Sequence, residues 1–477
     1  MAPIGIVSMS RRPEDPRLAS EFQFPAVVVS LWLGLGIAAA ARGPLLDQVW
    51  PDWQFGFGAS AIWGLNLLVL RYGVGPPIRL TRPPILAATF AFAMTLFGSG
   101  SYWATVQLYP AYHVAIERAA WFVAVCTLLM LLSVAIVQRV LRVRRLGRQE
   151  LLEWDWPRLG ATTYMLFVIA LFGTIVSINR IGYVPIIAGD PSSARVDFPA
   201  IGGFWYRLSM LGGVVSMLVA AQAAARRATV GQYLIGLAAL VLVGLYGPRY
   251  FVVFPLGVGA LLWDRARAQI KFGRGVALVL VVAPLLALVG YWREQNQAVA
   301  LLGPVGLALY GTMVEFRDLG WALDYFGLGD RFLHGRTLAS AVVPLLPSTA
   351  WQVLGIDKAT IYAQSSASAL ADAMGRASGQ RIGLYGEGFI NFGWSGAVIG
   401  AVLYGVLLAY LDNRYDRVGK AQVRSLFLAI GIATAVFAQI GQLDMFASTL
   451  TGYGYPIALA ALISARRNTA SNETRIA

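Results

Sequence analysis

Apolar runs of about twenty residues recur along this 477-residue chain and constrain its fold more than any other feature. An α-helix needs roughly 20 mainly apolar residues to cross the hydrocarbon core of a membrane. Hydrophobic residues make up 57% of the sequence and charged residues only 13%, which excludes an ordinary soluble enzyme and a disordered chain. The sequence therefore predicts an all-α integral membrane protein.

We expect about twelve transmembrane helices, because that many apolar runs are long enough to form them. These runs are 25–41, 54–70, 84–106, 119–138, 159–178, 203–225, 229–246, 250–263, 275–292, 386–411, 425–442 and 446–465. The predicted segments are a cytoplasmic N-terminus (1–24), helices 1–9 (25–292), a large external loop (293–384), helices 10–12 (385–465) and a cytoplasmic tail (466–477). Within the external loop, 301–316 predicts a helix that lies in or re-enters the membrane interface, and 363–377 predicts a short amphipathic helix.

The charge distribution orients this predicted bundle. The net charge is +14, and the basic residues are 35 arginines and 3 lysines. With the N-terminus inside, 25 of the 38 basic residues fall in cytoplasmic segments, whose net charge is +15, whereas the external segments carry −1. Cytoplasmic loops of membrane proteins are enriched in Lys and Arg. The basic charge therefore reports orientation, and nucleic acid is not expected as a partner.

The external arginines are exceptions to the enrichment of basic residues in cytoplasmic loops, and most of them lie in the later part of the chain. A guanidinium offers a rigid fork to two phosphate oxygens, so an arginine-rich outer face predicts a phosphate or pyrophosphate headgroup as ligand. The alternative is a set of solvated loop charges that pair with nearby aspartates. The external arginines are Arg42, Arg118, Arg180, Arg195, Arg207, Arg249, Arg293, Arg317, Arg331, Arg336, Arg376 and Arg381.

Arg249 is the strongest candidate among them. It follows Gly247 and Pro248 in a tight turn between two predicted helices, and proline suits the first turn of the second helix. An arginine at a helix N-terminus is unfavourable by itself, because its charge and the positive end of the helix dipole repel each other. Together with the free backbone N–H groups there, the arginine can bind an anion, so this position predicts an anion-binding site. Arg180 and Arg195 lie together in another external loop and are expected near the same headgroup.

Two carboxylates on the outer side are candidate bases. Glu315 ends the apolar stretch of the external loop, three residues before Asp318, and Glu387 opens a predicted span with Asn391 one turn later on the same face. Partly buried carboxylates can have raised pKa values and accept protons. The alternatives are a polar interfacial edge for Glu315 and a helix cap for Glu387. One cysteine and two distant histidines give no metal-binding pattern.

Two stretches resemble motifs of the bacterial O-antigen polymerases, the oligosaccharide repeat-unit polymerases. The late motif resembles a Gly-Glu pair followed by Asn-Phe-Gly and another Gly, which here are Gly386, Glu387, Asn391, Phe392, Gly393 and Gly396. The upstream motif is matched at Phe332, Gly335, Arg336, Thr337, Pro344, Pro347 and Trp351. The turn ending in Arg249 is similar to a Gly-x-Arg turn of some members.

The resemblance implies a GT-C-like polytopic bundle in the bacterial cytoplasmic (inner) membrane, and the charge distribution predicts that both termini are cytoplasmic. The protein would polymerise repeat units at the outer face of this membrane, with undecaprenyl-pyrophosphate-linked oligosaccharides as both donor and acceptor. No metal or cofactor is expected, and a chain-length regulator is a further candidate partner. Glu387, Glu315 and Arg249 would be catalytic. The residues that would bind pyrophosphate or sugar are Arg180, Arg195, Arg293, Arg336, Arg381 and Asn391.

Two other functions stay open at this point. An O-antigen ligase of the same architecture would make a single transfer to an acceptor such as lipid A core. A flippase or transporter of lipid-linked sugars would show two related halves and charges near mid-span. The sequence shows neither feature clearly, because its external charges cluster at the outer end.

Overall fold

A computed structural model describes most of the chain as helix. The described residues are 53–74, 81–92, 94–95, 116–143, 152–187, 201–246, 250–266, 314–327, 331–346, 348–357, 360–361, 363–374, 381–415, 418, 423–439, 441 and 443–467. Within these ranges, five helices are long and apolar enough to cross a membrane. They are Arg118–Val140, Trp156–Ile181, Gly203–Ala224, Gly383–Tyr415 and Met445–Ser464. The prediction of a helical membrane protein is thereby confirmed.

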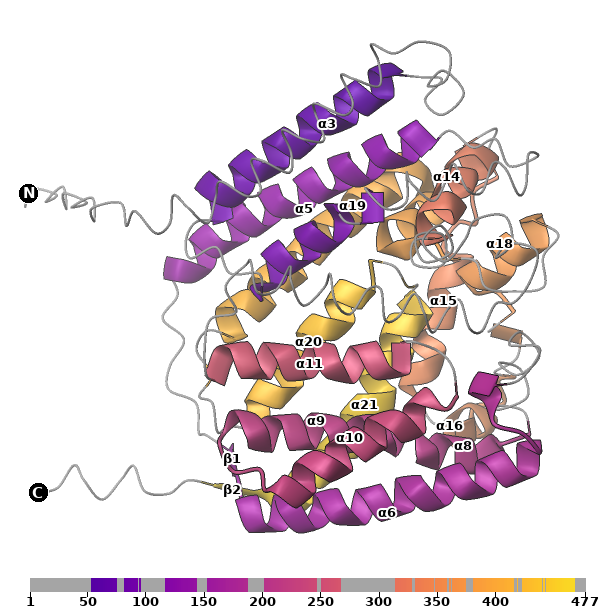
Figure 1. The fold of residues 1–477 in the computed structure, drawn as a ribbon. Coiled ribbons are helices and arrows are strands. Elements are labelled where there is room, and N and C mark those ends of the chain that lie inside the picture. Colours follow the sequence, from indigo (N-terminus) through magenta and orange to yellow (C-terminus); the bar gives the residue numbers. More distant parts are fainter. Residues whose placement is uncertain are drawn as a thin grey trace, which may run out of the picture.

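The first half of the described chain forms two packed groups of helices (Figure 1). In one group, α3 (Trp53–Leu68) and its π-helical extension η1 (Val69–Val74) pack on α5 (Ile116–Val143). In the other, α9 is surrounded by its neighbours and almost entirely buried. This second group comprises α6 (Trp156–Ile181), η2 (Pro185–Ile187), α8 (Gly203–Ser209), α9 (Leu211–Ala224), α10 (Val230–Gly244) and α11 (Tyr250–Ala266).

The second half joins these groups. α19 (Gly383–Tyr415) packs along α5, whereas α20 (Val423–Phe437) and α21 (Leu443–Ser464) contact α11 and α6 respectively. Shorter helices gather beyond one end of the long ones (Figure 1). These are α14 (Val314–Gly327), α15 (Arg336–Val342), η3 (Val343–Leu345), α16 (Ser348–Val353) and α18 (Ser366–Met374).

Several boundaries differ from the sequence expectation. The predicted span 203–225 is divided into α8 and α9, and α20 ends at Phe437, before the predicted end at 442. The helix expected over 363–377 begins later, as α18 at Ser366, and 375–377 lie outside the described residues. The predicted spans 25–41 and 275–292, and 301–313 of the predicted interfacial helix, lie outside the described residues.

A small antiparallel strand pair departs from the all-α expectation. β1 (Leu152–Trp154) pairs with β2 (Ala465–Arg467), in the register that places Leu152 opposite Arg467. The backbone N–H of Asp155 donates to Ser464 O at 2.7 Å, and the Asp155 side chain then caps the first turn of α6. The pair thus fastens the start of α6 to the end of α21.

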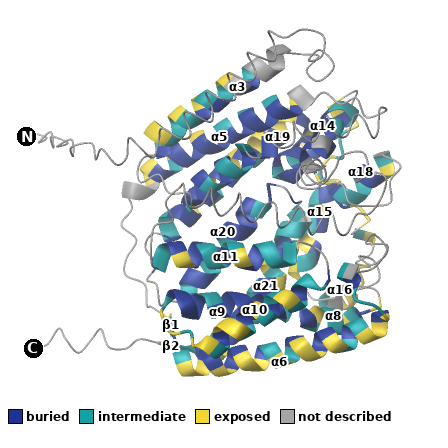
Figure 2. Cartoon of the chain, in the orientation of Figure 1, coloured by how far each residue is buried: buried dark blue, intermediate teal, exposed yellow. Residues whose placement is uncertain are grey.

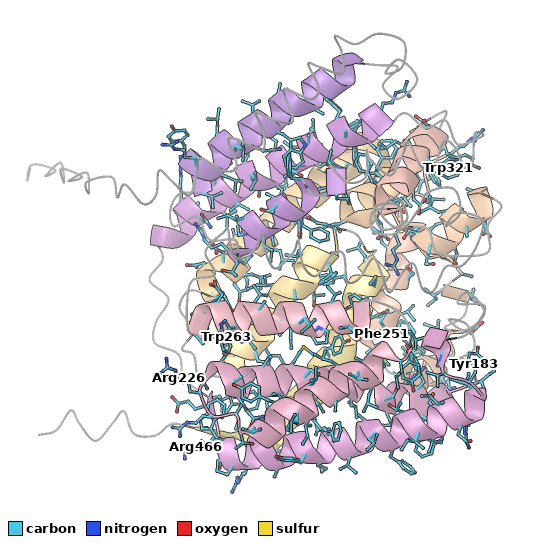
Figure 3. All side chains as sticks on the ribbon, viewed as in Figure 1. Tyr183, Arg226, Phe251, Trp263, Trp321 and Arg466 are labelled. Atoms are coloured by element: carbon cyan, nitrogen blue, oxygen red, sulfur yellow. The ribbon has the colours of Figure 1, made fainter. Side chains whose placement is uncertain are left out.

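The described helix ends form two groups at opposite ends of the bundle. Arg226 and Arg466 lie at one end, beside the strand pair, and Tyr183 and Trp321 lie at the other (Figure 3). We refer to these as the Arg226 end and the Trp321 end. Segments predicted to be cytoplasmic gather at the Arg226 end, and segments predicted to be external gather at the Trp321 end. Which end faces the cytoplasm stays a prediction.

A buried ion pair holds the Arg226 end together. Arg82 and Asp412 are 8% and 3% exposed, and their closest N–O distance is 2.6 Å. Gln138 of α5 also donates to the Asp412 carboxylate at 2.6 Å. Because burial removes both charges from water, each charge would be strongly destabilising without its partner. This contact ties α5, α19 and the helix Pro83–Phe92 together.

The outer faces of the long helices are apolar. On α6, Val168, Phe172 and Ile175 are exposed, and the exposed residues form a stripe along its free side (Figure 2). Large apolar side chains on such a face need an apolar medium, which lipid tails supply. The surface of the bundle is therefore suited to a membrane.

Candidate functional site

The late glycine-rich motif forms a sharp break inside α19, where the sequence predicted an uninterrupted span. Gly393 has φ 63° and ψ −150°, a conformation essentially restricted to glycine. Across the break, a Cβ placed on Gly388 would lie 2.5 Å from the carbonyl oxygen of Gly396. In an unbroken helix, residues eight apart are separated by about 12 Å. The first part of α19 therefore turns back so that its backbone touches the second part.

Glu387 lies in the first part of α19 and is 1% exposed. Its carboxylate accepts a hydrogen bond from the Thr337 hydroxyl at 3.1 Å and another from the backbone N–H of Leu443 at 2.8 Å. Leu443 is the first residue of α21, so the positive end of that helix dipole stabilises the negative charge. Glu387 thus joins three elements: α15, α19 and α21.

Asn391 extends the same network by one turn of helix. Its amide Nδ2 donates to Thr337 Oγ1 at 2.6 Å and to the Glu387 carbonyl at 2.8 Å. Its Oδ1 accepts from the Gly335 N–H at 3.0 Å, and its backbone carbonyl accepts from the His334 N–H at 3.0 Å. The structure thereby brings together the two stretches, 332–337 and 386–396, that the sequence singled out separately.

A cavity of about 510 Å³ lies beside this network at the Trp321 end. Its size is within the usual range for small-molecule sites. Thr337 is buried but belongs to the cavity lining, and its hydroxyl donates to Glu387, so one side chain separates the buried carboxylate from the cavity. The lining residues are Tyr325, Phe326, Arg331, Leu333, Arg336, Thr337, Ala363, Gln364, Ala369, Asp372 and Ala373.

The cavity lining combines two kinds of polar group. Arg331 and Arg336 supply guanidinium donors, which suit phosphate or carboxylate oxygens. Thr337, Gln364 and Asp372 supply hydroxyl, amide and carboxylate groups, which suit sugar hydroxyls. An anionic glycosylated ligand would find partners for both of its parts here.

Arg381 lies just before α19, outside the cavity lining. Its backbone N–H donates to the carboxylate of Asp318 at 3.2 Å, and Asp318 is buried on α14. Arg381 is therefore held beside α14, one of the elements that line the cavity.

Arg180 is exposed in the last turn of α6. Its neighbour Ile181 packs in one small cluster with Tyr246 and Phe251, the residues on either side of the predicted anion-binding turn. The end of α6 is thus close to the α10–α11 junction. Arg195, Arg249 and Arg293 lie outside the described residues, as does the side chain of Glu315 in α14.

Sequence reasoning missed several lining residues. Arg331 appeared only as one external arginine among twelve, although Tyr325 and Trp321 have the i, i+4 spacing that stacks aromatic rings on a helix. Gln364 and Asp372 carry no signal in the sequence. Among the described residues, no group of three His, Cys, Asp or Glu side chains is placed to hold a metal ion. Comparison of the chain with protein-family models, with curated proteins and with solved structures found no match.

Proposed function

We propose that this chain is a membrane glycosyltransferase that polymerises undecaprenyl-pyrophosphate-linked oligosaccharide units into a surface polysaccharide. One observation carries the proposal. The two stretches that resemble O-antigen polymerase motifs, though about fifty residues apart, meet in a single buried network around Glu387, Thr337 and Asn391. That network borders a cavity lined by two arginines. The proposal includes twelve spans in a GT-C-like arrangement, with the Trp321 end outside a bacterial cytoplasmic membrane.

The reaction breaks the bond between the donor sugar's anomeric carbon and the pyrophosphate, while an acceptor hydroxyl forms the new glycosidic bond. Lipid pyrophosphate leaves with its electron pair, so it needs charge neutralisation more than protonation, and arginines provide it. Arg336 does this from the cavity wall, with Arg180, Arg249 and Arg381 as further candidates. Arg195 keeps the pyrophosphate-binding role expected from the sequence, and Arg293 keeps its supporting role.

The acceptor hydroxyl loses a proton, and the geometry suggests its route. Thr337 is buried, belongs to the cavity lining and donates to Glu387. In this proposal the bound acceptor hydroxyl reaches Thr337, which takes the acceptor's proton as it passes its own to the carboxylate. Asn391 fixes the Thr337 hydroxyl by donating to its oxygen. In this proposal Glu387 is the base acting through Thr337, and Glu315 is the second candidate.

The competing functions predict different arrangements of charge. A transporter needs charged groups along a mid-membrane path. Among the described residues, the buried charged side chains fall in two groups. Asp264 and Asp412 lie near the last residues of α11 and α19, with Arg82 paired to Asp412, whereas Asp318 lies in α14 and Glu387 near the first residues of α19. This distribution supports an enzyme with its site at one end. A ligase would use the same site, and only its product differs.

Deletion of the gene followed by gel analysis of surface glycan length tests the proposal. We expect single repeat units to accumulate, and Glu387→Gln or Thr337→Val to fail to restore the ladder of lengths. Thr162→Val is the matched control, because it removes a buried hydroxyl that bonds Ser464 at the Arg226 end. Accumulation of unattached polymer would identify a ligase, and a normal ladder in both site variants would contradict the proposed roles.

A further inference from the structure

Tyr325 and Arg331, which line the cavity, are in contact with each other, and Trp321 packs on Tyr325. Trp321 and Tyr325 are one helical turn apart on α14, and their ring centroids are 4.7 Å apart with planes inclined by 15°. The Arg331 guanidinium carbon lies 4.7 Å from the centroid of the Tyr325 ring. Trp321 itself lies at the end of the bundle that bears the cavity (Figure 3). The Tyr325 ring therefore contacts both Trp321 and the Arg331 guanidinium.

Contact with the Tyr325 ring holds the Arg331 guanidinium in place without using its N–H donors. A guanidinium that lies on an aromatic ring uses its flat face and keeps its N–H groups, which point outward in its plane, for acceptors. Arg331 lines the cavity together with Arg336. Within the part of the chain that the structure describes, neither of these side chains forms an ion pair, whereas Arg82 and Arg118 each bind an aspartate. Two cations therefore face one cavity with donors to offer.

We propose that Arg331 is a further substrate-binding residue, which binds one phosphate of a lipid-linked diphosphate while Arg336 binds the other. Tyr325 and Trp321 are its positioning residues. This inference rests on the proposed function and adds a binding role for three side chains. Two guanidinium forks match the two phosphate groups of a diphosphate, because each fork takes a pair of oxygens.

The cavity lining also sets the direction of the ligand. Asp372 of α18 repels an anion, so the diphosphate lies on the wall formed by Arg331 and Arg336. The sugar then lies towards Asp372 and Gln364, which bond hydroxyl groups. Thr337, next to Arg336 in sequence, belongs to the same lining, and the transferred bond is expected beside it.

Binding of farnesyl diphosphate to the purified full-length protein in detergent, measured by calorimetry, tests this inference. Arg331→Ala removes a charge-assisted contact and should weaken binding about 10- to 100-fold. Tyr325→Leu keeps Arg331 but removes the aromatic ring that the guanidinium contacts, and should weaken binding about two- to five-fold. Tyr325→Phe, which keeps the ring, should bind like the wild type. Thermal unfolding of each variant reports whether it is folded.

A second stacked pair provides matched controls. Arg414 lies 5.2 Å from the Tyr410 ring centroid at the Arg226 end. Arg414→Ala and Tyr410→Leu should therefore leave farnesyl diphosphate binding unchanged. Wild-type affinity in Arg331→Ala, or no binding by the wild type, would overturn the inference.

Two competition arms distinguish the source of the phosphate. Inorganic pyrophosphate should compete, because it carries both phosphate groups, whereas phosphatidylglycerol in detergent should not. Equal competition by phosphatidylglycerol would overturn the diphosphate assignment in favour of a phospholipid site. The proposed function can fail on its own. That outcome is an unchanged surface glycan after gene deletion, while farnesyl diphosphate binding still depends on Arg331. Loss of the ladder on deletion, with normal binding and ladder in Arg331→Ala, would refute only this inference.

Discussion

The contact between Glu387 and Thr337 offers a test that does not depend on knowing the substrate. Glu387→Gln preserves the shape of the side chain but removes its charge, and Thr337→Val preserves the branched shape but removes the hydroxyl. Both groups are buried, and the hydrogen bond that joins them is 3.1 Å long. If this bond couples the two side chains, Glu387→Gln weakens and Thr337→Val removes the same interaction.

The magnitude follows from the hydrogen bonds. A hydrogen bond to a charged group contributes about 1.5–3 kcal/mol, and one between neutral groups about 0.5–1.5 kcal/mol. Glu387→Gln should therefore cost about 1–2 kcal/mol. Thr337→Val should cost about 2–3 kcal/mol, because it also leaves the Asn391 amide without this acceptor. The double variant should cost about 1–2 kcal/mol less than the sum, within the range of coupling energies measured for contacting residues.

Denaturant unfolding of the purified protein in micelles measures these costs. As a reference, Glu387→Gln combined with Thr162→Val at the opposite end should be additive, since distant sites add to within about 0.5 kcal/mol. If Glu387→Gln and Thr337→Val are also additive within that margin, the two side chains are not coupled. The proton route through Thr337 would then lose its structural basis.

Three further predictions concern the fold. Gly393→Ala should destabilise the protein by about 1–3 kcal/mol in the same unfolding assay, because its conformation suits only glycine, whereas Gly400→Ala, which meets nothing within 4 Å, should be neutral or stabilising. Asp412→Ala should cost about 3–5 kcal/mol by leaving its arginine partner buried and uncompensated, and wild-type stability would argue against the buried pair. In intact cells, a membrane-impermeant maleimide should label Tyr183→Cys but reach Arg226→Cys only after permeabilisation; the opposite pattern would reverse the orientation.

The helices were predictable because a membrane selects long apolar runs, which remain visible in the sequence. The break at Gly393 was not predicted, because an apolar run shows composition and not the dihedral angles of one residue. The strand pair of β1 and β2 was missed for a related reason: three residues carry too little periodicity to predict a strand. Such a short pair forms where helix ends are already held together.

The candidate site was predictable only in part. The i, i+4 spacing placed Glu387 and Asn391 on one face, and the structure joins them through the Asn391 amide. Their meeting with Thr337 depends on the break in α19 and on contacts between segments distant in sequence. The cavity depends on the same assembly, so Arg331 could not be told apart from other external arginines until its ring platform was seen.

The most direct test of the central claim is reconstitution of the purified chain in liposomes with a lipid-linked repeat unit. The proposed function predicts a ladder of glycan lengths on a gel and the release of one polyprenyl diphosphate for each new glycosidic bond. Glu387→Gln should abolish both, while Thr162→Val should leave both intact. Movement of the lipid-linked unit across the bilayer without release of polyprenyl diphosphate would contradict the claim and identify a transporter.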